Sequence, residues 1–220
     1  MKVLLFGATG MIGQGVLREC LLDPRVTEVI SLLRSPTREK HPKLTEVYHG
    51  DFFDYAGLEE RLAGLDICCF CLGVTSAGLD EAAYSRMTHD LTLAAATFLA
   101  PLNPAMTFCY ISGAGADSTE QGRIMWARVK GRTENALLRL PFRATYIFRP
   151  GAIQPLHGIR SRTALYRALY AVLGPFLPLM KALSPDSLTT TEQLGKAMLQ
   201  AGLAGAPKAI LEMPDINRLG

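Results

Sequence analysis

Residues 3–21 read VLLFGATGMIGQGVLRECL, and this stretch decides the fold. Its first four residues are apolar and predict a short buried strand. Its second half repeats apolar residues at helical spacing, which predicts a helix beginning after three glycines; these residues are Ile12, Val16, Leu17 and Leu21. A strand, a glycine turn and a helix in this order are typical of the first unit of a parallel α/β sheet.

Gly7, Gly10 and Gly13 have the spacing G-x-x-G-x-x-G, which differs from the commoner G-x-G-x-x-G. In such a unit the first glycine permits a tight turn, the second lets a pyrophosphate approach the backbone, and the third lets the helix pack against the strand. The phosphates would lie at the positive N-terminus of the helix. Three glycines also occur in ordinary turns, but their position between the first strand and the first helix favours a dinucleotide-binding loop.

The rest of the chain continues the alternation. Further strands are predicted at 26–33, 44–48, 66–72, 106–111, 143–148 and 208–212, and helices at 56–63, 79–100, 121–139, 162–182 and 189–203. Apolar strands that alternate with amphipathic helices predict a parallel sheet covered on both faces. We therefore predict an α/β fold with a doubly wound parallel sheet, which forms a single domain over 1–220. Because the alternation fails after residue 150, we predict that residues 151–207 form a small C-terminal helical capping segment of this domain.

The composition is that of an ordinary globular chain. Of 220 residues, 49% are hydrophobic and 20% charged, which excludes collagen-like, disordered and disulfide-scaffold proteins. The net charge is +3 with Lys and Arg scattered, so we expect no nucleic-acid partner. Residues 91–116 are uncharged, but Pro101, Asn103 and Pro104 interrupt them and predict a helix, a turn and a strand instead of a membrane span. We expect neither export nor membrane insertion.

The five cysteines stand at positions 20, 68, 69, 71 and 109, and three of them fall in one apolar run. This odd number gives no disulfide framework and fits a reducing cytoplasm. Cys68 and Cys71 form a C-x-x-C pair, but a zinc site would need a second pair, and the four histidines lack ligand spacing. We therefore predict no metal. In a strand, Cys69 and Cys71 would share one face and Cys68 would take the other.

The end of the second predicted strand bears on which dinucleotide is bound. An Asp or Glu at this point would bind the ribose 2′-hydroxyl of NAD, whereas Arg suits the 2′-phosphate of NADP. The chain has Arg34 there, with Ser35 beside it and Arg38 nearby. These residues favour NADP. Arg34 could equally be a solvated loop charge, so NAD stays open.

Seven stretches in order resemble the atypical branch of the short-chain dehydrogenase/reductase superfamily, whose members have the NAD(P)-binding Rossmann fold. Within it the chain is most similar to the Tat-interacting-protein type of oxidoreductase and to NAD-dependent epimerase–dehydratase-like proteins. The stretches run almost from end to end: GATGMIGQG at 7–15, GDF at 50–52, ICCFCLGVT at 67–75, ISGAGAD at 111–117, VKGRTE at 129–134, FRPG at 148–151 and INRLG at 216–220.

The resemblance implies which residues contact the cofactor. Asp51 and Phe52 would flank the adenine, and Leu72, Gly73 and Val74 would pass beneath the cofactor. Lys130 would hold the nicotinamide ribose, and Pro150–Gly151 would line the nicotinamide pocket. With the glycine loop, the expected cofactor-binding set is Gly7, Thr9, Gly10, Met11, Ile12, Gly13, Arg34, Asp51, Phe52, Leu72, Gly73, Val74, Lys130, Pro150 and Gly151.

The chain departs from the family at the catalytic residues. Reductases of this superfamily use Ser, Tyr and Lys, with Tyr four residues before Lys. Here Lys130 is present, but Trp126 stands four residues earlier. An indole donates a hydrogen bond but cannot protonate an alkoxide. Ser112 ends the fifth strand, and Gly113 follows where the family often has another Ser. The expected catalytic residues are therefore Ser112, Trp126 and Lys130, with Trp126 in an orienting role.

Four tyrosines are candidates for the missing acid: Tyr84, Tyr110, Tyr166 and Tyr170. Each is expected to be a packing residue with its hydroxyl at an edge. Tyr166 is the replacement to consider, because it lies on the apolar helix predicted at 163–183. That helix would roof the substrate pocket or contact a second copy or a partner protein. The helix at 121–139 also carries Arg123, Arg128, Lys130 and Arg132, and we expect all but Lys130 to form a solvated face.

Two functions stay open. The first is an NADP(H)-dependent oxidoreductase that acts on a small apolar carbonyl-type substrate through a non-standard site. The second is a non-catalytic NADP(H)-binding regulatory or redox-sensing protein that signals to a partner. Lys130 and the RPG stretch at 149–151 favour the first, and Trp126 favours the second.

Overall fold

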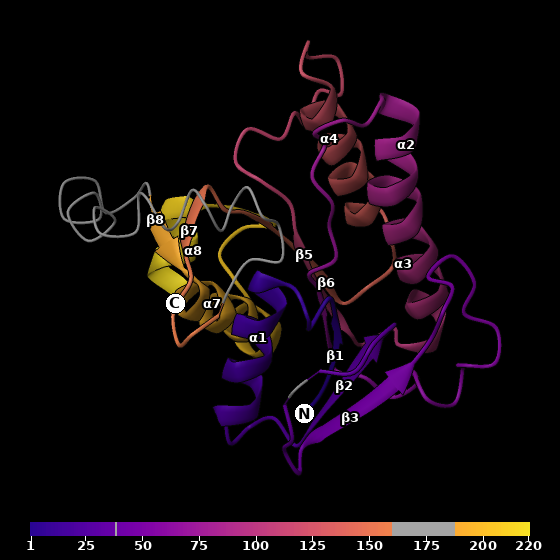
Figure 1. Ribbon diagram of the computed structural model, residues 1–220, viewed down its shortest axis with the longest axis vertical. Coiled ribbons are helices and arrows are strands. Elements are labelled where there is room, and N and C mark those ends of the chain that lie inside the picture. Colours follow the sequence, from indigo (N-terminus) through magenta and orange to yellow (C-terminus); the bar gives the residue numbers. More distant parts are fainter. Residues whose placement is uncertain (38, 160–187) are drawn as a thin grey trace.

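The computed structural model describes residues 1–37, 39–159 and 188–220 (Figure 1). Within these residues a seven-stranded sheet has the order β3-β2-β1-β4-β5-β6-β9, with all neighbouring strands parallel. Its strands are β1 (Lys2–Phe6), β2 (Glu28–Leu33), β3 (Leu44–Tyr48), β4 (Ile67–Phe70), β5 (Thr107–Ile111), β6 (Ala144–Arg149) and β9 (Ile210–Glu212). The predicted α/β fold with a parallel sheet is confirmed.

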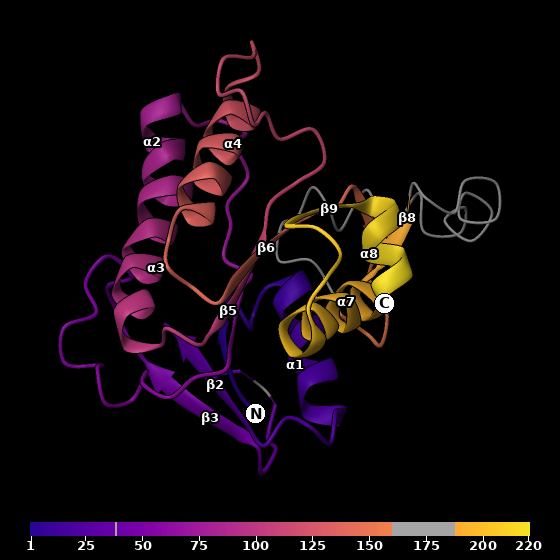
Figure 2. The same ribbon diagram turned by 180° about the vertical axis from the view of Figure 1, so that it is seen from behind.

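Helices cover both faces of this sheet. One face carries α1 (Met11–Leu22) and α7 (Thr191–Ala204), and the other carries α3 (Leu91–Leu102) and α4 (Met125–Leu138) (Figures 1 and 2). α2 (Glu81–Ser85) leads through the π-helical turn η1 (Arg86–Asp90) into α3, and α8 (Met213–Leu219) follows β9. The sheet is therefore doubly wound, as predicted.

Side chains of β1 alternate between two hydrophobic cores. Val3 and Leu5 belong to the core beneath α1 and α7, whereas Leu4 and Phe6 belong to the core on the opposite face. All four are fully buried, because a central parallel strand is covered on both sides. The uninterrupted apolar run in the sequence follows from this double burial.

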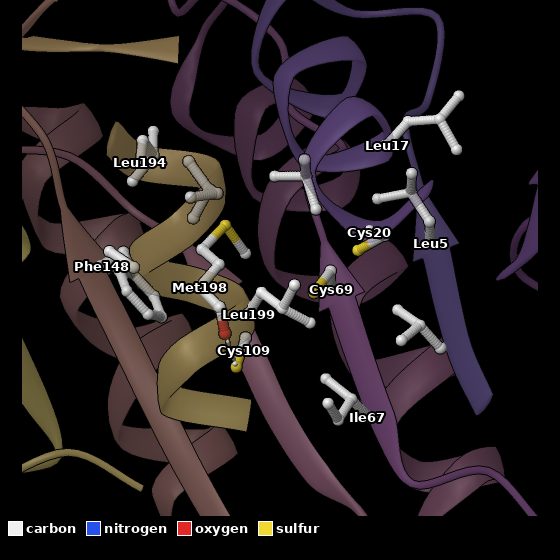
Figure 3. Close-up of a cluster of buried hydrophobic side chains, with 14 of the residues drawn as sticks. Leu5, Leu17, Cys20, Ile67, Cys69, Cys109, Phe148, Leu194, Met198 and Leu199 are labelled. Carbon is white, nitrogen blue, oxygen red and sulfur yellow. Dashed lines mark hydrogen bonds between the residues drawn. The ribbon is translucent and has the colours of Figure 1, made fainter. Parts of the chain in front are cut away.

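The cysteines are packing residues of these cores. Figure 3 shows Cys20, Cys69 and Cys109 among leucine and methionine side chains of the core beneath α1 and α7. Cys68 lies in the opposite core and Cys71 packs against the same core as Cys69, as strand alternation predicts. All five cysteines are free. Contact with Cys109 and burial raise the pKa of the Cys69 thiol, and burial raises the pKa of Cys68, which suits unreactive core thiols.

The short helix predicted at 56–63 is wrong, because these residues form turns and bends. Gly57 and Gly64 have φ values of +82° and +70°, a left-handed conformation that reverses the chain at both ends of the segment. Leu62 between them is fully buried. Its burial accounts for the apolar spacing that resembled a helix.

Three predicted helices begin later than expected, and one of them, predicted at 189–203, begins at Thr191. α4 begins at Met125 instead of residue 121, because the Asp117 carboxylate accepts N–H bonds from Thr119 and Gly122 and holds the preceding residues in a turn. The helix predicted at 79–100 begins at Glu81, where the Asp80 side chain accepts from the N–H of Ala83 and caps the first turn.

The predicted capping segment, 151–207, is described only in part. Its predicted helix at 162–182, the apolar stretch 163–183, and Tyr166 and Tyr170 lie outside the described residues. On either side of the gap, β7 (Ala152–Gln154) and β8 (Leu188–Thr190) pair in a small parallel sheet that the sequence did not predict. α8 was not predicted either.

Candidate functional site

The three glycines of the first loop have three different surroundings. Gly7 has φ +80°, and a β-carbon there would lie 2.7 Å from the carbonyl oxygen of Cys71. A β-carbon on Gly13 would lie 2.0 Å from the carbonyl oxygen of Gly7, so α1 packs directly on the loop. A β-carbon on Gly10 would meet only that same oxygen, at 3.3 Å. Gly7 and Gly13 are therefore required by packing, while Gly10 borders open space.

Beside the glycine loop, at the carboxyl ends of β1, β2 and β4, lies a cleft of about 520 Å³. Its lining residues are Gly7, Thr9, Leu32, Leu33, Arg34, Ser35, Phe52 and Leu72. The chain crosses from β3 over β1 to β4, so the strand order reverses beside β1. In open parallel sheets, ligands bind at this reversal point. α1 begins here, with Gly10 as N-cap and no acidic residue in its first turn, so its N-terminus suits an anion.

The predicted cofactor-binding residues divide between the wall and the rim of this cleft. Phe52 is buried and packs edge-on against Phe6, with ring centroids 6.1 Å apart. Arg34 and Asp51 are exposed. The Asp51 carboxylate accepts the N–H of Phe53 at 2.8 Å, which fixes the turn after β3. Arg38 lies outside the described residues.

The other predicted cofactor-binding residues lie at or near the same edge of the sheet. Leu72 is half-buried and lines the cleft, whereas Gly73 and Val74, which follow it, are exposed. Met11 and Ile12 are half-buried in the first turn of α1. The structure thus brings the glycine loop, Arg34, Phe52 and Leu72 around one cleft. Their contact with a cofactor stays a prediction.

Lys130 lies at the carboxyl end of β5. Its Nζ donates to the hydroxyl of Tyr110 at 3.1 Å and to the carbonyl oxygen of Ile111 at 3.2 Å. Burial lowers the pKa of the Lys130 ammonium. Burial also raises the pKa of Tyr110, which is 1% exposed, so this phenol is a poor proton donor. Tyr84 is buried on α2.

Trp126 lies one helical turn before Lys130 on α4. It is half-buried, and its six-membered ring rests against the loop after β5: β-carbons on Gly113 and Gly115 would lie 3.9 and 3.7 Å from the ring. Both distances are those of ordinary van der Waals contact, so the indole lies directly against the loop. The ring forms a flat apolar wall beside the loop that begins at Ser112, a geometry that suits an orienting residue.

Ser112 belongs to a buried network that the sequence did not predict. Its hydroxyl donates to Glu134, which is fully buried. Arg149 contacts the same carboxylate through Nη2 at 2.5 Å and Nε at 3.1 Å, and also reaches Ser118 and Glu212. Glu134 and Arg149 lie within the stretches VKGRTE and FRPG, so the resemblance pointed to the region. No local pattern in the sequence predicted that Glu134 and Arg149 would form an ion pair.

The basic residues of α4 do not form a purely solvated face. Arg128 donates to the Glu81 carboxylate and to the carbonyl oxygen of Gly122, each at 2.6 Å. Arg132 donates to the Ser85 hydroxyl at 2.7 Å. The bonds to Glu81 and Ser85 join α4 to α2, and the two helices are in contact. Arg123 is exposed.

Pro150 joins the loops that follow β5 and β6. Its carbonyl oxygen accepts the N–H of Ala114 at 2.9 Å, and the exposed Gly151 follows it. Ser112 in turn donates its N–H to the carbonyl oxygen of Phe148 at 2.7 Å. Ser112, Pro150 and Gly151 are therefore held at one edge of the sheet.

Within residues 1–37, 39–159 and 188–220, no group of three or more His, Cys, Asp and Glu side chains could hold a metal ion. None of the helices over these ranges is both long and apolar enough to cross a membrane.

No family model matches the chain. Among curated proteins it is similar to protein fmp52, mitochondrial, of Emericella nidulans, with 29% identity over 210 residues that cover 92% of this chain and 87% of that protein. It is 27% identical to protein fmp52-1, mitochondrial, of Aspergillus terreus, over 100% of this chain and 98% of the relative. With protein FMP52, mitochondrial, of Saccharomyces cerevisiae it shares 28% identity over 74% of this chain and 69% of the relative.

Solved structures share the fold. The dTDP-glucose 4,6-dehydratase DesIV of Streptomyces venezuelae, solved with NAD and TYD bound, superposes with a TM-score of 0.69 and 18% identity over 97% of this chain and 75% of that one. A short-chain dehydrogenase/reductase family oxidoreductase from Burkholderia thailandensis gives a TM-score of 0.66 and 17% identity, over 96% and 89% of the two chains.

The cytoplasmic location predicted from the cysteines is contradicted, because the curated relatives described above are all named mitochondrial. Unpaired thiols indicate a reducing environment and do not distinguish one reducing compartment from another. The likeness to curated proteins and to solved structures extends over nearly the whole chain. The chain therefore has the Rossmann fold of NAD(P)-binding short-chain dehydrogenases/reductases and epimerase–dehydratases, and it is similar to the mitochondrial FMP52 proteins of fungi.

Proposed function

We propose that the protein is an NADP(H)-dependent oxidoreductase that acts on a small apolar carbonyl-type substrate. The observation that carries this proposal is the cleft beside β1, which Gly7 and Thr9 of the glycine loop and the exposed Arg34 line. The open side of Gly10 and the N-terminus of α1 follow directly in the same loop. Together they offer a close backbone approach for a pyrophosphate and a cation for a further phosphate.

The residues of the cleft fit a dinucleotide. A pyrophosphate would lie over Gly10, where no side chain blocks the backbone. Arg34 and Ser35 would bind the 2′-phosphate, since a guanidinium can donate two parallel hydrogen bonds to a phosphate. Phe52 would provide an apolar wall for the adenine, and Asp51 would lie beside it.

The nicotinamide end would lie near Lys130, Pro150 and Gly151. A bound nicotinamide supplies the hydride chemistry of the reaction. Two N–H bonds of the Lys130 ammonium are taken by Tyr110 and Ile111, and the third can hold the ribose hydroxyls. Proton transfer is the weak step, because Trp126 is not an acid and burial raises the pKa of Tyr110.

Trp126 also supports a second candidate function. Without the family's phenol, the site suits a protein that binds NADP(H) and reports its occupancy to a partner. The indole rests on the Gly113–Gly115 loop, and a movement of this loop on cofactor binding would be the signal. This candidate shares the cofactor site with the first and differs only in turnover.

A two-part experiment separates the candidates. Calorimetric titration with NADPH and NADH first tests cofactor binding, and we expect one NADPH per chain. Turnover is then followed by absorbance of the reduced cofactor with a panel of small aldehydes and ketones, and in reverse with the matching alcohols. Turnover of any pair supports the oxidoreductase. Stoichiometric binding without turnover supports the regulatory protein, and an absence of binding contradicts both.

A further inference from the structure

The Ser112 hydroxyl proton is committed to a buried carboxylate. Ser112 follows β5, keeps 8% of its surface exposed, and donates its Oγ–H to Oε1 of Glu134. Glu134 is fully buried, and an ionised carboxylate only accepts hydrogen bonds. The proton on Ser112 therefore points away from a ligand and cannot also be offered to one.

Arg149 keeps Glu134 in this accepting state. Its Nη2 and Nε contact the two carboxylate oxygens at 2.5 and 3.1 Å. Its other N–H groups are held by Ser118 at 2.6 Å and Glu212 at 3.1 Å, so the guanidinium is fixed from several sides. If Ser112 turned its proton elsewhere, Oε1 of Glu134 would lose a hydrogen bond in a buried place, which is costly.

Among the described residues, no hydrogen-bond donor contacts the lone pairs of Ser112 Oγ. Over residues 1–37, 39–159 and 188–220, Oγ takes part in the bond to Glu134, and no N–H or O–H donates to it. A hydroxyl whose proton is already hydrogen-bonded to the protein can accept a hydrogen bond from a ligand but cannot donate one to it. Ser112 therefore suits a ligand group that carries a proton.

We infer that Ser112 recognises a hydroxyl group, so that of an alcohol and its carbonyl compound the site binds the alcohol. This inference rests on the proposed function, together with the catalytic role that the family resemblance implies for Ser112. A carbonyl oxygen carries only lone pairs and would face the lone pairs of Ser112. Its binding would require Ser112 to release Glu134, which lowers affinity by about tenfold or more.

Trp126 provides a readout that needs no turnover. It is the single tryptophan of the sequence, and its ring rests on the loop that begins at Ser112. Protein labelled with ¹⁵N therefore gives one indole N–H resonance from this site. The protein is saturated with NADP⁺ and titrated with cyclohexanol and with cyclohexanone, which differ only in the oxygen group. We expect the alcohol to bind about tenfold more tightly than the ketone.

Glu134→Ala should remove this preference. It deletes the carboxylate that accepts the Ser112 proton, so the hydroxyl can donate to a ketone as well as accept from an alcohol. Glu212→Ala is the matched control, because Glu212 contacts the same guanidinium but not Ser112. It should keep the preference for the alcohol.

Ser112→Ala serves if Glu134→Ala does not fold, because it removes only the hydroxyl. It should make the affinities for the alcohol and the ketone equal. Equal affinities in the wild-type protein, a preference for the ketone, or no response of the indole to either probe would overturn the inference. Failure of NADP⁺ to bind in the same samples would instead overturn the proposed function, and the inference with it.

Discussion

Arg34 carries the prediction about cofactor choice. It is exposed at the rim of the cleft beside Ser35, where a 2′-phosphate would lie. We expect the protein to bind NADPH more tightly than NADH, and Arg34→Ala to lower NADPH affinity by about tenfold, the worth of one bond between charged groups. Affinity for NADH should stay nearly unchanged. Calorimetric titration of both nucleotides measures the difference.

Arg123→Ala is the control for this prediction, because Arg123 is also an exposed arginine but does not line the cleft. It should leave both affinities unchanged. Equal losses of NADPH and NADH affinity in Arg34→Ala, or a preference of the wild-type protein for NADH, would show that Arg34 does not contact a 2′-phosphate.

Gly10 and Gly13 should respond differently to the same substitution. Gly10→Val places a branched side chain on the open side of the loop, where the pyrophosphate would approach the backbone, so the protein should fold but lose nucleotide binding. Gly13→Val should destabilise the protein, because its β-carbon would lie 2.0 Å from the carbonyl oxygen of Gly7. Thermal unfolding and calorimetry separate the two effects. If Gly10→Val still bound NADPH with unchanged affinity, the pyrophosphate would lie elsewhere.

Trp126→Tyr should add the missing acid. A phenol at this position lies one turn before Lys130, and the ammonium would lower its pKa. We expect the wild-type protein to reduce ordinary ketones and aldehydes very slowly, because general-acid catalysis is typically worth about 10²–10⁴-fold. The variant should gain rate, with a maximum at mildly basic pH. Steady-state turnover against pH measures this gain.

The matched control for that gain is the double variant with Lys130→Ala, in which the phenol has no ammonium beside it. The gain should vanish there. If the wild-type protein is instead a fast reductase and Trp126→Tyr changes nothing, the proton comes from another group, such as a water held by Ser112.

At the level of elements, the contact between α1 and α7 depends on two glycines. A β-carbon on Gly15 would lie 2.5 Å from the carbonyl oxygen of Thr191, and one on Gly195 would lie 2.9 Å from the carbonyl oxygen of Gly15. The two backbones therefore touch without side chains between them. This contact fixes α7 against α1, the helix whose N-terminus borders the cleft.

Gly195→Ala should therefore destabilise the protein by about 1–3 kcal/mol, the usual cost of overpacking, even though alanine is the better helix former. Chemical denaturation measures the free energy of unfolding. Gly50→Ala is the control, since a β-carbon on Gly50 meets nothing within 4 Å. An unchanged or higher stability of Gly195→Ala would mean that the two helices move apart at little cost.

Residues that follow several different strands line the cleft, so a bound cofactor should stabilise the whole molecule against unfolding. Gly7 follows β1, Arg34 follows β2 and Leu72 follows β4, and a ligand that contacts all three loops binds only the folded chain. At a hundred times its Kd, a ligand adds about 2.7 kcal/mol, which raises Tm by about 5–10 °C in a chain of this size.

We expect NADPH to produce this increase of Tm and NADH at the same concentration to produce a smaller one. Differential scanning fluorimetry measures both. Gly10→Val provides the control, since its Tm should not respond to either nucleotide. An equal increase with NADH would contradict the assignment of the 2′-phosphate to Arg34.

The order of strands and helices could be predicted from the sequence because it depends on local patterns. Continuous apolar runs, helical spacing and glycine turns each involve residues a few positions apart, and their alternation selects a parallel sheet. The predicted helix at 56–63 failed for the same reason: turns at Gly57 and Gly64 and a buried Leu62 imitate a helical pattern over a short window. The ends of parallel strands then bring the glycine loop and Arg34 to one edge.

The chemistry of the site depends on contacts that no local pattern contains. Arg149 pairs with Glu134 across 15 residues and with Glu212 across 63, and Lys130 meets Tyr110 across 20. Each partner taken alone resembles an ordinary surface charge or a core aromatic. The sequence by itself determined the fold and the place of the cleft, because periodicity and turn chemistry are local. Only the tertiary structure decided which way the Ser112 proton points, because strand packing sets the distances between residues far apart in the chain.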